Sequence, residues 1–201
     1  MDQRDTSGAE YAERLRRLEG VWWKRLLNVQ APYRWNLRRL ELGRTLDVGC
    51  GIGRNLINLG PDSVGVDHNP DSIAIARDRG LRAYTVEEFL ASGYATPDRF
   101  DALLVAHVVE HMPEPDARDV VGMYLPYLRP GGRVLFITPQ EKGYASDHTH
   151  VRFCGFAEVS SLAADLGLRV EKRYSFPIGR WAGRWFTYNE FNVLTRKPEV
   201  A

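Results

Sequence analysis

The pattern of hydrophobic positions divides the chain into a helical beginning and a longer part in which strands and helices alternate. Apolar residues recur every three or four positions from Tyr11 to Val29, which predicts an amphipathic helix that Pro32 ends or kinks. A second, short helix is predicted over residues 33–40. We therefore expect residues 1–44 to form an N-terminal helical lid within the same domain as residues 45–201.

Short β runs begin at Thr45 and alternate with helical stretches. Seven strands are predicted, over residues 45–49, 63–67, 83–86, 100–106, 133–138, 169–176 and 187–195. Helices are predicted between or after them, over residues 72–79, 86–92, 116–128 and 156–166. This alternation predicts an α/β fold with a Rossmann-like, doubly wound sheet of seven mostly parallel strands. The last two strands have no helix between them, so they should form a reversed C-terminal β-hairpin.

Composition then narrows the class of protein. The chain has 201 residues, 44% of them hydrophobic and 26% charged, with a formal net charge of +1, which fits one globular domain and excludes bulk disorder. No apolar run is long enough to span a bilayer, no apolar signal segment is visible near the start, and two cysteines make no disulfide framework. We therefore expect a cytoplasmic protein that does not associate with membranes.

A glycine-rich loop lies at the junction between the first predicted strand and a helix that is expected to follow it. Gly49, Gly51 and Gly53 would let the backbone turn tightly and approach a ligand closely. Asp67 ends the second predicted strand, 18 residues after Gly49, where a carboxylate can accept both hydroxyls of a ribose or cap the following turn. The third glycine comes one residue too early for the dinucleotide pattern Gly-x-Gly-x-x-Gly, which disfavours NAD.

Four segments in order resemble the motifs of the class I S-adenosylmethionine-dependent methyltransferases, over residues 46–55, 64–67, 100–105 and 128–134. The resemblance is to the small-molecule type and implies S-adenosylmethionine as cofactor. Many members place Asp at the end of the third strand, where this chain offers Thr85 or Glu87. The contacts that the resemblance implies for the cofactor are Asp47, Gly49, Gly51, Gly53, Asn55, Asp67, His68, Thr85, Val86, Glu87, Ala106 and His107.

A cluster of histidine and glutamate follows the fourth predicted strand. His107-x-x-Glu110-His111 fits the inverted zinc-hydrolase signature, but Pro113 leaves no room for the helix which that motif needs. The cluster also resembles the Glu-x-x-Glu-His of metal-using O-methyltransferases of the ubiquinone pathway and of small RNA, with His107 in place of the first Glu. One interpretation is a divalent metal bound by His107, Glu110, His111 and His148; the other is that Glu110 and His111 brace a turn.

Methyl transfer to a hydroxyl requires an acceptor held in line and removal of its proton. A histidine with a pKa near neutrality suits the role of base. His148 and His150, which flank Thr149 after Asp147, are the leading candidates, followed by His111. The alternative is that they are ordinary surface histidines in a polar loop.

Charge and aromatic content indicate where the acceptor would bind. Residues 1–44 and 169–201 each carry a net charge of +4 and together hold all five tryptophans, whereas residues 45–168 carry −7. Aromatic rings and guanidinium groups suit an aromatic or anionic small molecule, while a homodimer contact is an alternative and too few cations are present to follow a nucleic-acid backbone. The predicted acceptor-binding residues are Tyr33, Trp35, Tyr144, Arg180, Trp181 and Trp185.

The sequence thus predicts an S-adenosylmethionine-dependent methyltransferase of a small metabolite, acting on a hydroxyl or carboxylate oxygen. One alternative is a metal-dependent 2′-O- or catechol-type methyltransferase that uses the His/Glu cluster. Another is a cofactor-binding partner or regulatory protein that transfers no methyl group.

Overall fold

The computed structural model describes residues 30–199, so the helix predicted over Tyr11–Val29, and with it most of the predicted lid, lies outside the described residues. The strands are β1 (Thr45–Val48), β2 (Val64–Asp67), β3 (Ala83–Thr85), β4 (Phe100–Ala106), β5 (Leu128–Pro139), β6 (Arg169–Phe176) and β7 (Glu190–Arg196). The α-helices are α3 (Ala31–Arg39), α4 (Pro70–Asp78), α5 (Val86–Leu90), α6 (Glu114–Tyr124), α7 (Glu141–Ala145) and α8 (Phe156–Asp165). Short 3-10 helices are η1 (Leu56–Asn58), η2 (Val109–His111), η3 (Leu125–Tyr127) and η4 (Arg180–Arg184).

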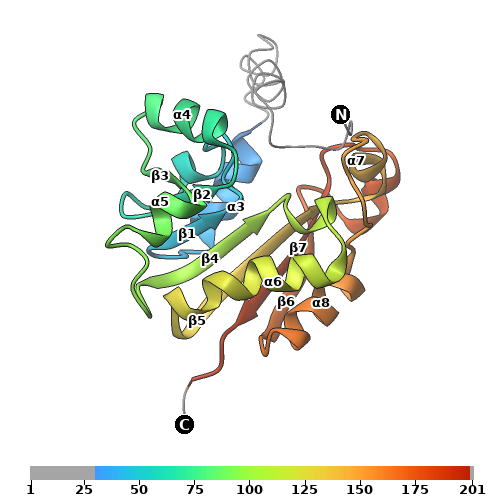
Figure 1. Ribbon diagram of the computed structural model, residues 1–201. Coiled ribbons are helices and arrows are strands. Elements are labelled where there is room, and N and C mark those ends of the chain that lie inside the picture. The colour runs from blue at the N-terminus through green and yellow to red at the C-terminus, as the bar shows by residue number, and fades with distance from the viewer. Residues whose placement is uncertain (1–29, 200–201) are drawn as a thin grey trace.

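In the described part of the chain the strands form one seven-stranded sheet in the order β3-β2-β1-β4-β5-β7-β6 (Figure 1). The pairs that join β3, β2, β1, β4 and β5 are parallel, and β7 runs antiparallel to both of its neighbours. The predicted doubly wound sheet with a reversed C-terminal hairpin is therefore confirmed. Because β1 lies between β2 and β4, the chain reverses its winding direction there, and ligands bind at such a point, beyond the carboxyl ends of the strands.

Helices cover both faces of the sheet (Figure 1). On one face, α5, α6 and α8 pack on the sheet around a core that includes Phe89, Val121 and Leu162. On the other face, α3 packs through Leu37 against a smaller cluster that contains Leu104 and other strand residues, while α4 packs beside it. No helix within residues 30–199 is long and apolar enough to cross a membrane.

The connection between β1 and β2 corrects one expectation. The glycine loop was predicted to open an α-helix, but it leads only to the single turn of η1. Gly49, Gly51 and Gly53 all have positive φ, of 70°, 50° and 81°, so a helix cannot begin before Arg54. η1 ends at Asn58, and β2 begins at Val64.

Candidate functional site

The glycine loop is held against its neighbours by close contacts that a side chain would block. A Cβ atom on Gly49 would lie 2.4 Å from Val108 Cγ2, and one on Gly53 would lie 2.2 Å from Leu81 Cδ1. The positive φ angles and these contacts together explain why glycine is needed at both positions. Since Val108 belongs to the segment after β4, the loop and the His/Glu cluster adjoin each other.

Two buried carboxyl groups lie behind the loop. Asp67, at the end of β2, accepts hydrogen bonds from the backbone N–H groups of Gly51, at 2.8 Å, and Asn69, at 2.9 Å. Asp47, on β1, accepts one from the backbone of Leu56, but within residues 30–199 its Oδ2 has no hydrogen-bond partner. An orphaned buried oxygen beside a glycine cradle fits a cationic ligand such as S-adenosylmethionine, whose ammonium can supply the missing donor.

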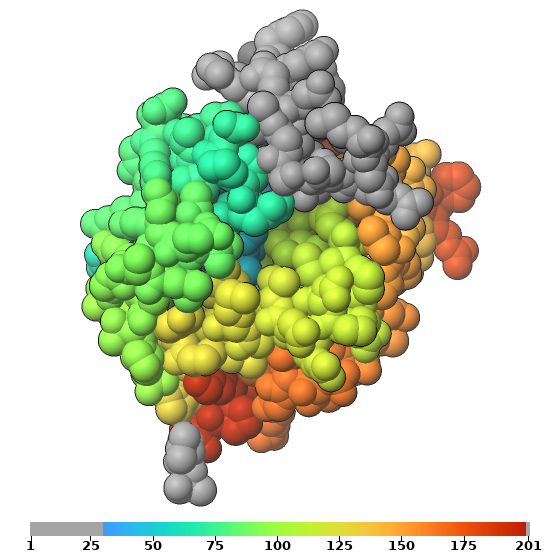
Figure 2. Space-filling model, in the orientation of Figure 1, coloured from blue at the N-terminus to red at the C-terminus, as the bar shows by residue number. Residues whose placement is uncertain are grey.

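The other predicted cofactor contacts surround this centre. Figure 2 shows a hollow between the segment that contains α4 and α5 and the one that contains α6, with atoms of the chain near β1 at its floor. His68 follows Asp67 directly, and Thr85 uses its hydroxyl to cap α5 by accepting from the N–H of Glu88. Glu87 is exposed beside it. The remaining residues line the ends of neighbouring elements: Asn55 before η1, Val86 in α5 and Ala106 at the end of β4.

His107 lies between two glutamates. It follows β4 with a left-handed backbone, φ 57°, a conformation that costs energy in a residue with a Cβ and often occurs at functional sites. Its Nδ1 lies 3.3 Å from Glu110 Oε1 and its Nε2 lies 3.1 Å from Glu190 Oε1. Burial lowers the pKa of His107, but the two carboxylates outweigh burial and hold that pKa above its ordinary value.

Glu110 is fully buried, with an exposed fraction of 0%. Among the described residues neither of its carboxylate oxygens makes a hydrogen bond of good geometry. Burial raises the pKa of Glu110, but the neighbouring His107 and His111 rings outweigh it, so the net pKa lies below the ordinary value. The site therefore contains an ionised carboxylate that is shielded from water.

His111 and His150 form a pair beside Glu110, with ring centroids 4.8 Å apart. His111 Nδ1 lies 3.3 Å from the carbonyl oxygen of Thr149, and His150 Nδ1 lies 2.8 Å from that of Tyr144. Because a carbonyl only accepts, each Nδ1 carries the donated proton, so Nε2 is the nitrogen that holds the lone pair in a neutral ring. Burial lowers the pKa of His111, which favours the neutral ring that a base or a metal ligand requires.

The metal donors that the structure brings together differ from the predicted set. Glu110, His111 and His150 each offer one ligand atom, and these three atoms lie within 4.8 Å of one another. His107 directs both ring nitrogens to glutamates instead, and His148 is exposed and lies outside the group. The reason is local: Asp147 Oδ1 accepts the N–H of Thr149 and ties the loop into a turn that brings His150, two positions after His148, over His111.

The insertion between β6 and β7 is fastened by buried amides. Asn189 donates from Nδ2 to Gln140 Oε1 at 2.9 Å, and its own Oδ1 accepts the N–H of Ile178 at 3.0 Å. Gln140 also donates to the carbonyl oxygen of Glu190 at 3.0 Å. These contacts fix η4 over the end of β5. The sequence did not predict a role for Gln140, Asn189 or Glu190, because a single amide or acid in a sequence belongs to no recognisable motif.

The predicted acceptor residues separate into inner and outer groups. Tyr33 is half-buried and donates to the carbonyl oxygen of Tyr188 at 2.6 Å, while burial followed by the charge of Glu190 raises the pKa of Tyr33. Tyr144 stacks on His150. The outer residues are Trp35, which is exposed over Phe176, together with Trp181 and Trp185, which are 73% and 80% exposed.

Binding of an anionic acceptor would require a free cation, and Arg180 is not one. Its guanidinium group pairs with the carboxylate of Glu141 and lies 4.7 Å from the ring centroid of Phe191. The predicted anionic character of the acceptor therefore has no support from this residue.

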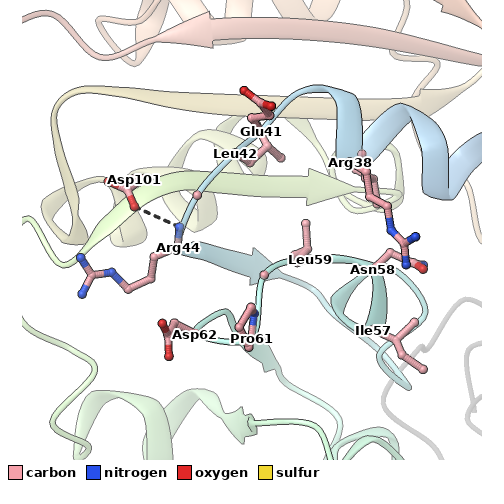
Figure 3. A pocket seen from close by; sticks show the side chains of 13 residues that line it. Arg38, Glu41, Leu42, Arg44, Ile57, Asn58, Leu59, Pro61, Asp62 and Asp101 are labelled. Atoms are coloured by element: carbon pink, nitrogen blue, oxygen red, sulfur yellow. Dashed lines mark hydrogen bonds between the residues drawn. The ribbon is translucent and has the colours of Figure 1, made fainter.

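An open depression of about 700 Å³ lies elsewhere, between α3 and the η1–β2 connection (Figure 3). Its lining includes Leu42, Arg44 and Asp101, and the N–H of Arg44 donates to Asp101 Oδ2 at 3.0 Å. Arg44 precedes β1 and Asp101 lies near the start of β4, so this depression is at the amino ends of the strands. The glycine loop and the His/Glu cluster are at the opposite, carboxyl edge, where a parallel sheet binds its ligand.

The sheet order, the glycine loop after β1 and the acid at the end of β2 define the class I S-adenosylmethionine-dependent methyltransferase fold. In sequence, residues 13–194 match the family model described as a methyltransferase domain, and the chain belongs to that family.

Individual relatives are similar over part of their length. The ubiquinone biosynthesis O-methyltransferase of Xanthomonas oryzae pv. oryzae is 30% identical over 141 residues, which cover 60% of this chain and 57% of that protein. The chain thus spans a little over half the length of this curated relative.

Solved structures show the same fold at low sequence identity. The magnesium protoporphyrin IX methyltransferase of Synechocystis PCC 6803, solved with bound SAH, matches with a TM-score of 0.65 and 13% identity, over 96% of this chain and 97% of that chain. The [4+2]-cyclase SpnF matches with a TM-score of 0.55 and 20% identity, over 78% of this chain and 75% of that chain.

Proposed function

We propose that this chain transfers the S-methyl group of S-adenosylmethionine to a hydroxyl of a small molecule. The observation that carries the proposal is the contact between Val108 and Gly49, because it brings the segment that carries His111, whose ring lies beside that of His150, next to the cofactor loop. The cofactor, when bound, supplies a methyl group already activated by its sulfonium. The chain must then bind the acceptor, exclude water and take up the hydroxyl proton.

Each of these tasks has candidate residues. Asp67 and the glycine loop would hold the cofactor, with Asp47 beneath them. His111 and His150 would accept the hydroxyl proton on Nε2, because their Nδ1 atoms donate to carbonyl oxygens. The buried negative charge of Glu110 would stabilise the imidazolium that forms.

The acceptor class follows from similarity and from position. The relative in Xanthomonas oryzae is named as an O-methyltransferase, which supports oxygen as the methylated atom. Tyr33 and Tyr144 would form the inner wall of the acceptor site, and Trp181 and Trp185 its outer rim, which suits an aromatic acceptor. A homodimer contact through the same tryptophans is the competing use of that rim.

A metal-assisted variant of this reaction is the second candidate. Glu110, His111 and His150 offer a carboxylate and two imidazoles within 4.8 Å of one another, a donor set that suits a divalent transition metal. A bound divalent ion would lower the pKa of an acceptor hydroxyl so that solvent water takes up the proton, while the two histidines serve as ligands.

The test is turnover of purified protein with S-adenosylmethionine and a panel of phenols, catechols, carboxylates and amines, read as S-adenosylhomocysteine formed and methylated product. Methylation of an oxygen acceptor supports the proposal, and methylation of amines alone contradicts it. Loss of activity after chelation, restored by one added metal, selects the metal-assisted variant. Cofactor binding without turnover on any acceptor selects a binding or regulatory protein.

A further inference from the structure

Asp47 is a buried acid whose hydrogen bonding is incomplete. It lies on β1 with an exposed fraction of 1%, and it accepts a backbone hydrogen bond from Leu56. Its other oxygen, Oδ2, has no partner among residues 30–199. An ionised carboxylate in such a position would lack the donors that normally replace water, so its neutral form is favoured.

A second carboxylate strengthens this preference. Asp67 lies at the end of the adjacent strand β2, and two backbone N–H groups donate to its carboxylate. Within residues 30–199, the other titratable groups that face the two acids are the thiol of Cys50, the ring of His68, 3.4 Å from Asp67, and the hydroxyl of Tyr124 on α6. Burial and then the charge of Asp67 raise the pKa of Asp47 to about 8.

We propose that Asp47 carries a proton in the cofactor-free protein and releases it to solvent when the ammonium group of S-adenosylmethionine binds at Oδ2. The exchange balances: the O–H bond of Asp47 breaks, the buffer takes the proton, and the resulting carboxylate pairs with the ammonium, while no bond of the cofactor changes. The inference rests on the proposed cofactor but requires no knowledge of the acceptor. Asp47 thus recognises the charge of the amino-acid end of the cofactor, while Asp67 is left to the ribose.

Proton release links affinity to pH. With close to one proton released per cofactor, the association constant rises about tenfold per pH unit from pH 6 to pH 7, where Asp47 is still protonated in the free protein. The same coupling separates ligands by chemistry. S-adenosylhomocysteine retains the ammonium and should release the proton, whereas 5′-methylthioadenosine has the adenosine and a thioether but no ammonium and should not.

Isothermal titration calorimetry tests this directly. The full chain is titrated at pH 7 with S-adenosylhomocysteine in phosphate and in Tris, whose ionisation enthalpies differ greatly, so the difference in heat gives the number of protons released. We expect release of most of a proton for the wild type, none for Asp47→Asn, and the wild-type number for Asp62→Asn, which alters an exposed acid outside the site. Titration of the wild type with 5′-methylthioadenosine provides the same contrast without any substitution, should Asp47→Asn fail to fold.

Equal heats in the two buffers for the wild type would overturn the inference while leaving the cofactor assignment intact. Undiminished proton release from Asp47→Asn, or release on binding of 5′-methylthioadenosine, would assign the proton to another group and also overturn it. An absence of binding in both buffers would contradict the proposed cofactor itself.

Discussion

His107 Nε2 lies 3.1 Å from Glu190 Oε1, and this contact joins the end of β4 to the start of β7, 83 positions further along the chain. The other ring nitrogen of His107 approaches Glu110, so a single imidazolium compensates two acids, one of them fully buried. The strand carrying Glu190 follows the insertion with Trp181 and Trp185. The two sides of the candidate site are therefore held together by charge.

Replacement of His107 by alanine should destabilise the protein by about 2 kcal/mol, because it leaves Glu110 buried without a counter-charge. Urea denaturation measures the loss. Most of it should disappear in the double variant His107→Ala/Glu110→Gln, in which the buried side chain is neutral, while any cost of the left-handed backbone at position 107 is common to both variants. A single variant as stable as the wild type would show that the ion pair contributes nothing.

Asp47 should make the cofactor-free protein less stable as the pH rises. The pKa of Asp47 is about 8 in the folded state against an ordinary value of 3.8, so between pH 4 and pH 8 the folded state retains a proton that the unfolded state has lost. Stability therefore falls through this window, by an amount on the order of a few kcal/mol, and the contribution becomes constant above pH 8. Urea midpoints across this range should decline less steeply in Asp47→Asn, and equal slopes would contradict the assignment.

Substitution of His111 or His150 by alanine should reduce turnover about 100-fold, as expected when a general base is removed. The affinity for S-adenosylhomocysteine should remain unchanged, because neither ring lies in the glycine loop. His148→Ala is the matched control, two positions away and exposed, and should change turnover less than twofold. Equal losses in His148→Ala and His150→Ala would leave both leading candidates from the sequence in place and contradict the assignment of the base to the His111–His150 pair.

Gly183→Ala should loosen the insertion. A Cβ atom at position 183 would lie 2.0 Å from Gln140 Oε1 and 2.7 Å from Gln140 Cβ, so η4 must shift and the hydrogen bond to Asn189 must break. We expect a loss of about 2 kcal/mol in unfolding free energy. In Gly93→Ala, by contrast, the new Cβ meets no atom within 4 Å, and the stability should change by less than about 0.5 kcal/mol.

Alanine substitution of Trp181 and Trp185 distinguishes a surface role from a packing role. Because both side chains are largely exposed, the double variant should unfold within about 0.5 kcal/mol of the wild type. If the tryptophans form the rim of the acceptor site, KM for the acceptor rises while the affinity for the cofactor stays the same. If they form a homodimer contact, sedimentation of the variant shifts towards the monomer and KM does not change.

The sequence by itself determined the sheet and the cofactor loop. Alternating β and α periodicity specifies a parallel sheet without knowledge of distant contacts, and the glycines and Asp67 belong to a single β1–β2 unit whose spacing can be read directly. These features depend on backbone conformation over short distances, which residue type controls.

Only the tertiary structure decided how the polar side chains converge. Glu190 reaches His107 from a strand 83 positions away, and the choice of His150 over His148 depends on a turn made by Asp147 and on the carbonyl oxygen of Tyr144. The α-helix expected after the glycine loop is replaced by the single turn of η1, since positive φ angles at three glycines exclude a helical conformation up to Gly53. The direction of a loop side chain depends on which nearby polar groups still lack a hydrogen-bond partner. Those groups are defined only once the whole sheet is assembled.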